Sequence, residues 1–190
     1  MILRLHLLLD EIKRRSIHWW RIALVSIHTG MRASEVFRLR AQDVDLKGSC
    51  INVKDAKGGT RAAYLTPTAM QALAEILPID PGALVFPSRT GGISREKSET
   101  FDRSVATLGL NKGVTDNRDK MVFHTLRHTF GSWAVQRGIS LYVVAELMGH
   151  SIVEITKRYA KLSPDQKRVA MTQVEEMFHS ATPCPSPDGN

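Results

Sequence analysis

The hydrophobic pattern changes its period twice along the chain, and this change constrains the possible fold more than any other feature. Residues 17–28 carry apolar side chains at helical spacing, and helical patterns return after residue 66. Between them lie two short strand-like runs, residues 49–53 and 61–65, on either side of Lys57-Gly58-Gly59-Thr60. Paired glycines between two such runs indicate a tight hairpin turn. The pattern predicts an α+β fold that is mainly α, with a small three-stranded antiparallel sheet, including residues 44–45, at one edge of a helical core.

Start and stop signals set the limits of the helices. Thr29-Gly30 ends the helix over residues 17–28, because glycine adopts the left-handed C-terminal conformation at little cost. Thr66-Pro67 begins another helix, with a capping hydroxyl followed by proline in the first turn. One domain is expected over residues 1–180, followed by a disordered tail over residues 181–190. The expected helices cover residues 1–15, 17–28, 32–39, 66–76, 94–108, 124–136, 140–148, 152–159 and 163–178, with a polar loop over residues 109–120.

The balance of charge favours a polyanionic partner. The formal net charge is +7 and the isoelectric point is about 9.7. Basic residues outnumber acidic ones between Lys120 and Arg168. Charge alone does not separate a phosphate-binding surface from an ordinary solvated helix face. The same segment holds candidate histidine and tyrosine residues, however, and this favours the phosphate-binding interpretation.

The sequence gives no sign of a membrane segment or of secretion. No apolar run reaches the roughly 18 residues that span a bilayer. The apolar start of the chain is short and contains Arg4 and His6, and no small-residue cleavage site follows it. Cys50 and Cys184 lie far apart without metal-binding spacing, so neither a disulfide framework nor a cysteine metal site is expected. These features predict a cytoplasmic protein without a membrane partner.

His124 and Arg127 lie three residues apart at a predicted helix start, and therefore on one face of that helix. A helix N-terminus favours anions, and an arginine there can bind two phosphate oxygens at once. A surface arginine beside a core-edge histidine would give the same pattern. A metal pair is a further alternative, because His124 and His128 are spaced i,i+4, but Thr125 stands where a His-Glu-x-x-His site has glutamate. No metal or other cofactor is expected.

Three more basic residues lie at predicted turns. Arg32 occupies the first turn of a helix, where the dipole disfavours a cation, so an anion or a carboxylate such as Glu35 is expected beside it. Lys57 lies at the hairpin tip, where a lysine is normally solvated but can also reach into a DNA groove. His150 follows Gly149 at a sharp turn between helices, where it would either cap the preceding helix or donate a proton to a phosphate oxygen.

Tyr159 lies near the end of a short predicted helix, beside Lys157 and Arg158. A tyrosine in this position is commonly a half-buried packing residue. A phenol, whose pKa is about 10, is a poor nucleophile at neutral pH unless a base or nearby cations favour the loss of its proton. The basic neighbours make Tyr159 a candidate nucleophile.

In this order, the motifs resemble those of the tyrosine recombinases, the phage integrase family. They are Thr-Gly-x-Arg-x-x-Glu at residues 29–35, a lysine on a hairpin, His-x-Leu-Arg-His-Thr-Phe at residues 124–130, Leu-Met-Gly-His-Ser at residues 147–151, and Tyr159. The resemblance extends over about residues 10–170. It implies an enzyme, a site-specific DNA recombinase or integrase that cleaves and rejoins DNA strands without metal or ATP. Tyr159 would attack phosphorus and form a covalent 3′-phosphotyrosine, leaving a free 5′ hydroxyl.

The resemblance also implies a role for each of the other candidates. Arg32 and Arg127 would bind the non-bridging oxygens of the scissile phosphate. Lys57 would protonate the leaving 5′ oxygen, and His124 would assist proton transfer at the tyrosine. His150 would hydrogen-bond the phosphoryl group in the transition state.

Double-stranded DNA is the partner that the resemblance implies. In the full-length protein, a homotetramer on two duplexes is implied, with the C-terminal segment packed on a neighbouring protomer. Family members usually carry a DNA-binding domain before the first catalytic helix, and this N-terminal core-binding domain is expected to be absent here. The expected setting is the cytoplasm, on DNA, where a bacterial or phage-encoded enzyme integrates or excises a mobile element.

Two alternatives remain open. A type IB topoisomerase has the same chemistry but would relax supercoils as a monomer with little sequence preference, and the small size and the segment at residues 147–151 favour the integrase. The other alternative is a DNA-binding module that has lost its activity. The presence of all six expected catalytic residues argues against that alternative.

Overall fold

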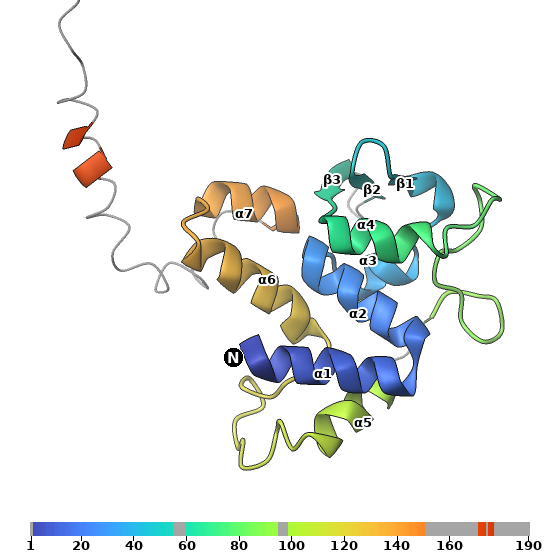
Figure 1. The fold of residues 1–190 in the computed structure, drawn as a ribbon, viewed down its shortest axis with the longest axis horizontal. Helices are drawn as coiled ribbons and strands as arrows, with labels where there is room; N and C mark the ends of the chain where they lie inside the picture. The colour runs from blue at the N-terminus through green and yellow to red at the C-terminus, as the bar shows by residue number, and fades with distance from the viewer. Residues whose placement is uncertain (1, 55–59, 95–98, 151–170, 174, 177–190) are drawn as a thin grey trace, which may run out of the picture.

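The computed structural model describes residues 2–54, 60–94, 99–150, 171–173 and 175–176. It confirms a mainly helical α+β fold with a three-stranded antiparallel sheet (Figure 1). In chain order, the elements are α1 (Ile2–Arg15), α2 (Ile17–Thr29), α3 (Ala33–Phe37), the 3-10 helix η1 (Ala41–Asp43), β1 (Val44–Asp45), β2 (Cys50–Lys54), β3 (Thr60–Tyr64), α4 (Pro67–Ala74), α5 (Glu99–Thr107), α6 (His124–Gln136) and α7 (Leu141–Met148).

Helix α2 runs through the centre of the helical part and packs against α1, α3, α4 and α6 (Figure 1). Every residue from Ile22 to Ile27 is buried. A helix that is buried on all sides needs apolar residues around its whole circumference, which explains its composition. The polar member of this run, Ser26, donates its hydroxyl to the carbonyl oxygen of Met31 at 3.3 Å. Helix α2 is therefore the axis on which the other elements are positioned.

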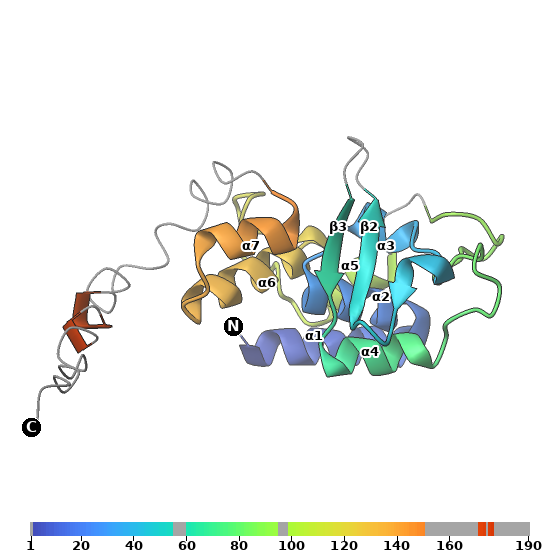
Figure 2. The same cartoon turned by 90° about the horizontal axis from the view of Figure 1, so that it is seen from above.

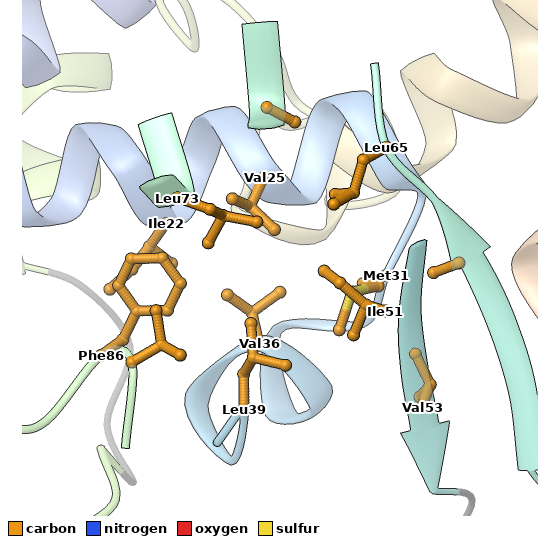
Figure 3. Close-up of a cluster of buried hydrophobic side chains, with 13 residues drawn as sticks. Ile22, Val25, Met31, Val36, Leu39, Ile51, Val53, Leu65, Leu73 and Phe86 are labelled. Carbon is orange, nitrogen blue, oxygen red and sulfur yellow. The ribbon is translucent and has the colours of Figure 1, made fainter. Parts of the chain in front are cut away.

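Two apolar cores lie on two faces of α2. On one face, Ile22 and Val25 join α2 to α3, the sheet and α4. Figure 3 shows this core, in which these two side chains face Val36 of α3. On the other face, Ala23 and Ile27 join α2 to α1, α5 and α6. Met31, in the turn that leaves α2, is buried in the first of these cores.

The sheet has the order β1-β2-β3, and both pairs are antiparallel. Ile51 pairs with Ala63, and Val53 pairs with Arg61. Ile51, Val53 and Ala63 are buried in the first core. Strand β3 is an edge strand, and α7 packs beside it (Figure 2). This contact brings β3 (Thr60–Tyr64) against a helix about 80 residues later in the chain.

The predicted limits of α2 and α4 are confirmed at the residues that stop and start them. Gly30 has φ 68° and donates its amide to the carbonyl of Ser26 at 3.0 Å. A Cβ atom at Gly30 would lie 2.6 Å from the ring of Phe130, so a side chain would meet both backbone strain and a clash. Thr66 caps α4 by accepting a hydrogen bond from the amide of Ala69 at 3.4 Å.

Helix α3 is shorter than predicted, because the chain after Phe37 pairs with a distant segment. The carbonyl of Leu39 accepts a hydrogen bond from the amide of Val85 at 2.9 Å, and Arg40 forms an antiparallel bridge with Leu84. These contacts take the place of the last helical turn. The sequence near residue 39 does not indicate that this segment pairs with residues 84–85.

The predicted helix over residues 94–108 is described from Glu99 to Thr107, and Ser94 lies outside it. The predicted helix over residues 152–159 and the tail over residues 181–190 lie outside the described residues. Of the predicted helix over residues 163–178, residues 171–173 and 175–176 are described, and they are helical. No helix in the described part of the chain is long and apolar enough to cross a membrane.

Candidate functional site

The turn between α2 and α3 places an arginine and a glutamate together. Arg32 is the N-cap residue of α3, and Glu35 lies in its first turn. One oxygen of Glu35 accepts the backbone amide of Arg32 at 2.7 Å, and the other accepts its guanidinium at 3.0 Å. A carboxylate at this position also interacts favourably with the helix dipole. Glu35 is therefore held at a fixed place, and it offsets the unfavourable position of Arg32 that the sequence indicated.

Two more arginines converge on the same carboxylate from other elements. Arg61 of β3 donates to Oε2 of Glu35 at 2.7 Å. Arg127 of α6 has Nη1 3.9 Å from the same oxygen. Three guanidinium groups around one carboxylate leave a surplus of positive charge. A partly buried surplus of this kind favours binding of an anion.

The C-terminal end of α7 faces this cluster, and each arginine donates to a different carbonyl of three consecutive residues. Arg61 donates to Leu147 at 3.0 Å, and Arg32 donates to Gly149 at 2.9 Å. Arg127 donates to the carbonyl between them, that of Met148. The last carbonyls of a helix lack partners within the helix and carry the negative end of its dipole, so cations stabilise them. The arginine cluster thus caps α7 and fixes its end in space.

Arg127 is the most deeply placed of the three, with a relative exposure of 1%. Its guanidinium also donates to the carbonyl of Gly30, in the turn that follows α2. A buried cation is tolerated only when hydrogen-bonding partners surround it. Arg127 therefore ties together the α2–α3 turn, Glu35 and the end of α7.

His150 is carried to the cluster by the turn that ends α7. Gly149 has φ 62° and donates its amide to the carbonyl of Glu146 at 3.1 Å, while the amide of His150 donates to Ala145 at 3.0 Å. These two bonds form a Schellman motif, which needs the left-handed conformation at the glycine. The half-buried His150 is therefore placed directly after the carbonyl that Arg32 binds.

His124 is the first residue of α6, and its side chain is exposed one turn before Arg127. Its ring packs edge-on against that of His128, with the ring centroids 4.4 Å apart. In the described part of the chain, no group of three or more histidine, cysteine, aspartate or glutamate residues is arranged to hold a metal ion.

An open groove of about 530 Å³ lies between β3 and α7. Its lining includes Arg61, Gly149 and His150 from the cluster, together with Tyr142 and Glu146 from the exposed side of α7. The groove gives solvent, and hence a ligand, access to this side of the cluster.

The structure thus brings together three of the residues singled out in the sequence, Arg32, Arg127 and His150, and places His124 at the start of the helix that carries Arg127. Lys57 and Tyr159 lie outside the described residues. The sequence analysis missed Arg61. An arginine on a short strand is typical of a solvated edge. Only its contacts with Glu35 and Leu147, 26 and 86 residues away along the chain, show that it belongs to the site.

Comparison with known proteins adds independent evidence. Residues 4–166 match the family described as the phage integrase family. Among curated proteins, the chain is similar to tyrosine recombinase XerC of Pelobacter propionicus, with 28% identity over 166 residues, which cover 84% of this chain and 51% of that protein. The chain spans about half the length of the curated relatives it matches.

Among solved structures, the crystal structure of XerA recombinase is similar with a TM-score of 0.63 and 28% identity, over 88% of this chain and 61% of that one. The Tn1549 transposon integrase in complex with transposon right end DNA is similar with a TM-score of 0.73, over 92% of this chain and 65% of that one. At 20% identity, the second likeness is one of fold.

Proposed function

The chain belongs to the phage integrase family of tyrosine recombinases, and from this premise we propose that it carries out site-specific DNA recombination. It cleaves and rejoins strands of double-stranded DNA through a covalent 3′-phosphotyrosine, without metal or ATP. The observation that carries the proposal is the convergence of Arg32 and Arg127 on Glu35, with surplus positive charge, beside the turn that holds His150.

The surplus charge suits a phosphodiester that gains negative charge as it reacts. Arg32 and Arg127 bind the two non-bridging oxygens, and His150 donates to the phosphoryl group. Because the transition state carries more negative charge than the ground state, fixed cations stabilise it more strongly. Two metal ions supply this stabilisation in many nucleases, and arginines can supply it here.

Tyr159 and Lys57, which lie outside the described residues, complete the proposed reaction together with His124. The phenol oxygen of Tyr159 attacks phosphorus, forming one P–O bond while the bond to the 5′ oxygen breaks. His124 assists removal of the phenol proton, and Lys57 gives a proton to the leaving 5′ oxygen. Attack by the 5′ hydroxyl of another strand then reverses these steps and frees the tyrosine. The phosphotyrosine conserves the bond energy, so rejoining needs no external energy source.

The wider setting is proposed from the family. Residues 1–180 form the catalytic domain, and the full-length protein acts on two duplexes as a homotetramer, joined through its C-terminal segment. It works in the cytoplasm, on DNA. Solved structures of similar fold include recombinases in complex with DNA, which supports DNA as the partner.

A covalent adduct tests the proposal most directly. The protein is incubated in excess EDTA with nicked duplexes whose sequence is randomised around the nick. Because of the nick, cleavage beside it releases a short fragment that diffuses away. We expect a protein–DNA adduct that survives denaturing electrophoresis. Tyr159→Phe should abolish the adduct, and the matched control Tyr142→Phe should retain it.

Other outcomes separate the alternatives. An adduct that needs a divalent metal, or that persists in Tyr159→Phe, would refute the mechanism. Relaxation of any supercoiled plasmid, without a preferred site, would indicate a topoisomerase. DNA binding without any adduct would indicate an inactive binding module.

A further inference from the structure

The mechanism proposed above gives no role to Arg61, although this residue bridges two parts of the site. It donates to Glu35 at 2.7 Å and to the carbonyl of Leu147 at 3.0 Å, and its side chain is only 15% exposed. We propose that Arg61 is a positioning residue, which holds Glu35 and the end of α7 so that Arg127 and His150 face the phosphate. This inference rests on the proposed function.

Glu35 is shared unequally among the three arginines. Arg61 and Arg32 take its two oxygens at 2.7 and 3.0 Å, whereas Arg127 stays 3.9 Å away. A carboxylate engaged by Arg61 competes less strongly with an incoming anion for Arg127. Without Arg61, Glu35 can turn toward Arg127 and form a close ion pair, which a phosphate oxygen would have to displace.

Arg61 also packs against the turn before His150. A Cβ atom at Gly149 would lie 2.5 Å from Nε and 2.8 Å from Cδ of Arg61, so the arginine packs directly on the backbone of this glycine. The same arginine holds the carbonyl of Leu147, two residues earlier. The backbone that leads into His150 is therefore shaped against the Arg61 side chain, and both residues line the groove between β3 and α7.

Both contacts of residue 61 depend on the shape of an arginine side chain. The planar guanidinium donates through two separate nitrogens, Nη1 to Leu147 and Nη2 to Glu35. A lysine carries one compact ammonium group and cannot reproduce this fork. Arg61→Lys should therefore keep the charge yet lose part of the positioning, which separates geometry from electrostatics.

The test compares Arg61→Gln and Arg61→Lys with wild type in single-turnover adduct formation at saturating DNA. We expect Arg61→Gln to lower the adduct rate about tenfold to hundredfold, the usual effect of a small misplacement of catalytic groups. At a salt concentration that screens the loss of one charge, DNA affinity should change little, and the adduct rate of Arg61→Lys should lie between those of wild type and Arg61→Gln. The matched control is Arg103→Gln, which removes an exposed arginine of α5 that pairs with Glu99, and it should behave as wild type.

Two other results would overturn the inference. If Arg61 were a DNA-backbone contact, Arg61→Gln would weaken DNA binding and reduce its salt dependence by about one counterion. If Arg61 were only a structural support, the adduct rate would fall together with DNA affinity and the thermal midpoint.

A double variant tests the link to Glu35. When Arg61→Gln and Glu35→Gln are combined, the loss in adduct rate should be no greater than in the more damaging single variant, because both residues act through one unit.

A second measurement keeps the inference apart from the proposed function. The NMR signals of the His150 ring, assigned by their loss in His150→Gln, should shift in Arg61→Gln and stay in place in Arg103→Gln, without DNA present. If wild type forms no adduct while His150 responds to Arg61, the proposed function fails and the positioning link stands. If His150 does not respond, the inference fails even though wild type forms the adduct.

Discussion

Two glutamates in this molecule each hold more than one arginine, and they do so in opposite ways. On α1, Glu11 bonds Arg14 at 2.8 Å and Arg15 at 2.7 Å, three and four residues further along the same helix. These two ion pairs follow from helical spacing, and Arg14 is 66% exposed. Water and salt screen such a pair, so it contributes little to stability.

The cluster around Glu35 is assembled by the tertiary fold. Arg61 comes from a strand 26 residues away, and Arg127 comes from a helix on the other side of the α2–α3 turn. All three of its arginines also bind the end of α7. The comparison teaches that the number of ion pairs does not locate a functional site. The deep burial of Arg127, the distances along the chain and the larger surplus of positive charge do.

The largest effect that separates the two clusters is expected for Arg127→Ala. The substitution removes the donors to the carbonyls of Gly30 and Met148 and leaves a cavity beside Glu35. We expect a loss of roughly 3–5 kcal/mol in the free energy of unfolding, as for other broken buried charge networks. Urea denaturation measures it. Arg14→Ala, the matched change on α1, should leave stability unchanged, and equal losses in both variants would break the comparison.

A smaller effect is expected for Glu35→Gln. The amide keeps the shape of the side chain but leaves three arginines without their shared carboxylate, which should cost about 1–3 kcal/mol. The added positive surplus should raise the affinity for non-specific DNA at low salt while the adduct rate falls. Fluorescence anisotropy at several salt concentrations measures the binding. A fall in non-specific affinity would contradict the view that surplus charge attracts the phosphate.

Two glycine substitutions sharpen the comparison at the end of α7. Gly149→Ala and Gly91→Ala both place an alanine at positive φ, 62° and 82°, which costs about 1–2 kcal/mol. Only at Gly149 does the new Cβ meet Arg61, whereas at Gly91 there is nothing within 4 Å. Gly149→Ala should therefore be the more destabilising of the two in urea denaturation. Equal losses would show that Arg61 moves aside freely.

The smallest effect is expected at Glu11, and it depends on pH. Hydrogen bonds from Arg14, and then Arg15, lower the pKa of Glu11 to about 2 from a usual value of 4.5. A carboxyl whose pKa is lower in the folded state stabilises the fold above its unfolded pKa and loses that contribution as pH falls. The thermal midpoints of wild type and Glu11→Gln should thus differ slightly at pH 6 and converge as the pH falls from about 5 to 2. A difference as large at pH 2 as at pH 6 would mean that Glu11 acts through packing instead.

Much of the fold could be predicted because its signals are local. The limits of α6 were predicted to the residue. Gly30 ends α2, as the left-handed backbone conformation at this glycine requires. The early end of α3 could not be predicted, because it depends on the bond between Leu39 and Val85. Local spacing also indicated a carboxylate for Arg32, and the structure provides Glu35 three residues later.

The candidate site divides in the same way. Arg32 and Glu35 lie within one helical turn of each other, so the sequence already indicates their ion pair. The convergence of Arg127 and His150 was implied only by the resemblance to a family, since 117 residues separate Arg32 from the carbonyl that it binds at Gly149. Arg61 could not be identified from the sequence, because its contacts depend on how the sheet packs against α7.

The end of α7 has one further consequence. Three neighbouring carbonyl oxygens give the arginines partial negative charges to bind. They damp the mutual repulsion of the guanidinium groups. The cations are therefore gathered during folding, and under the proposed function a phosphate would meet an arginine cluster that is already assembled.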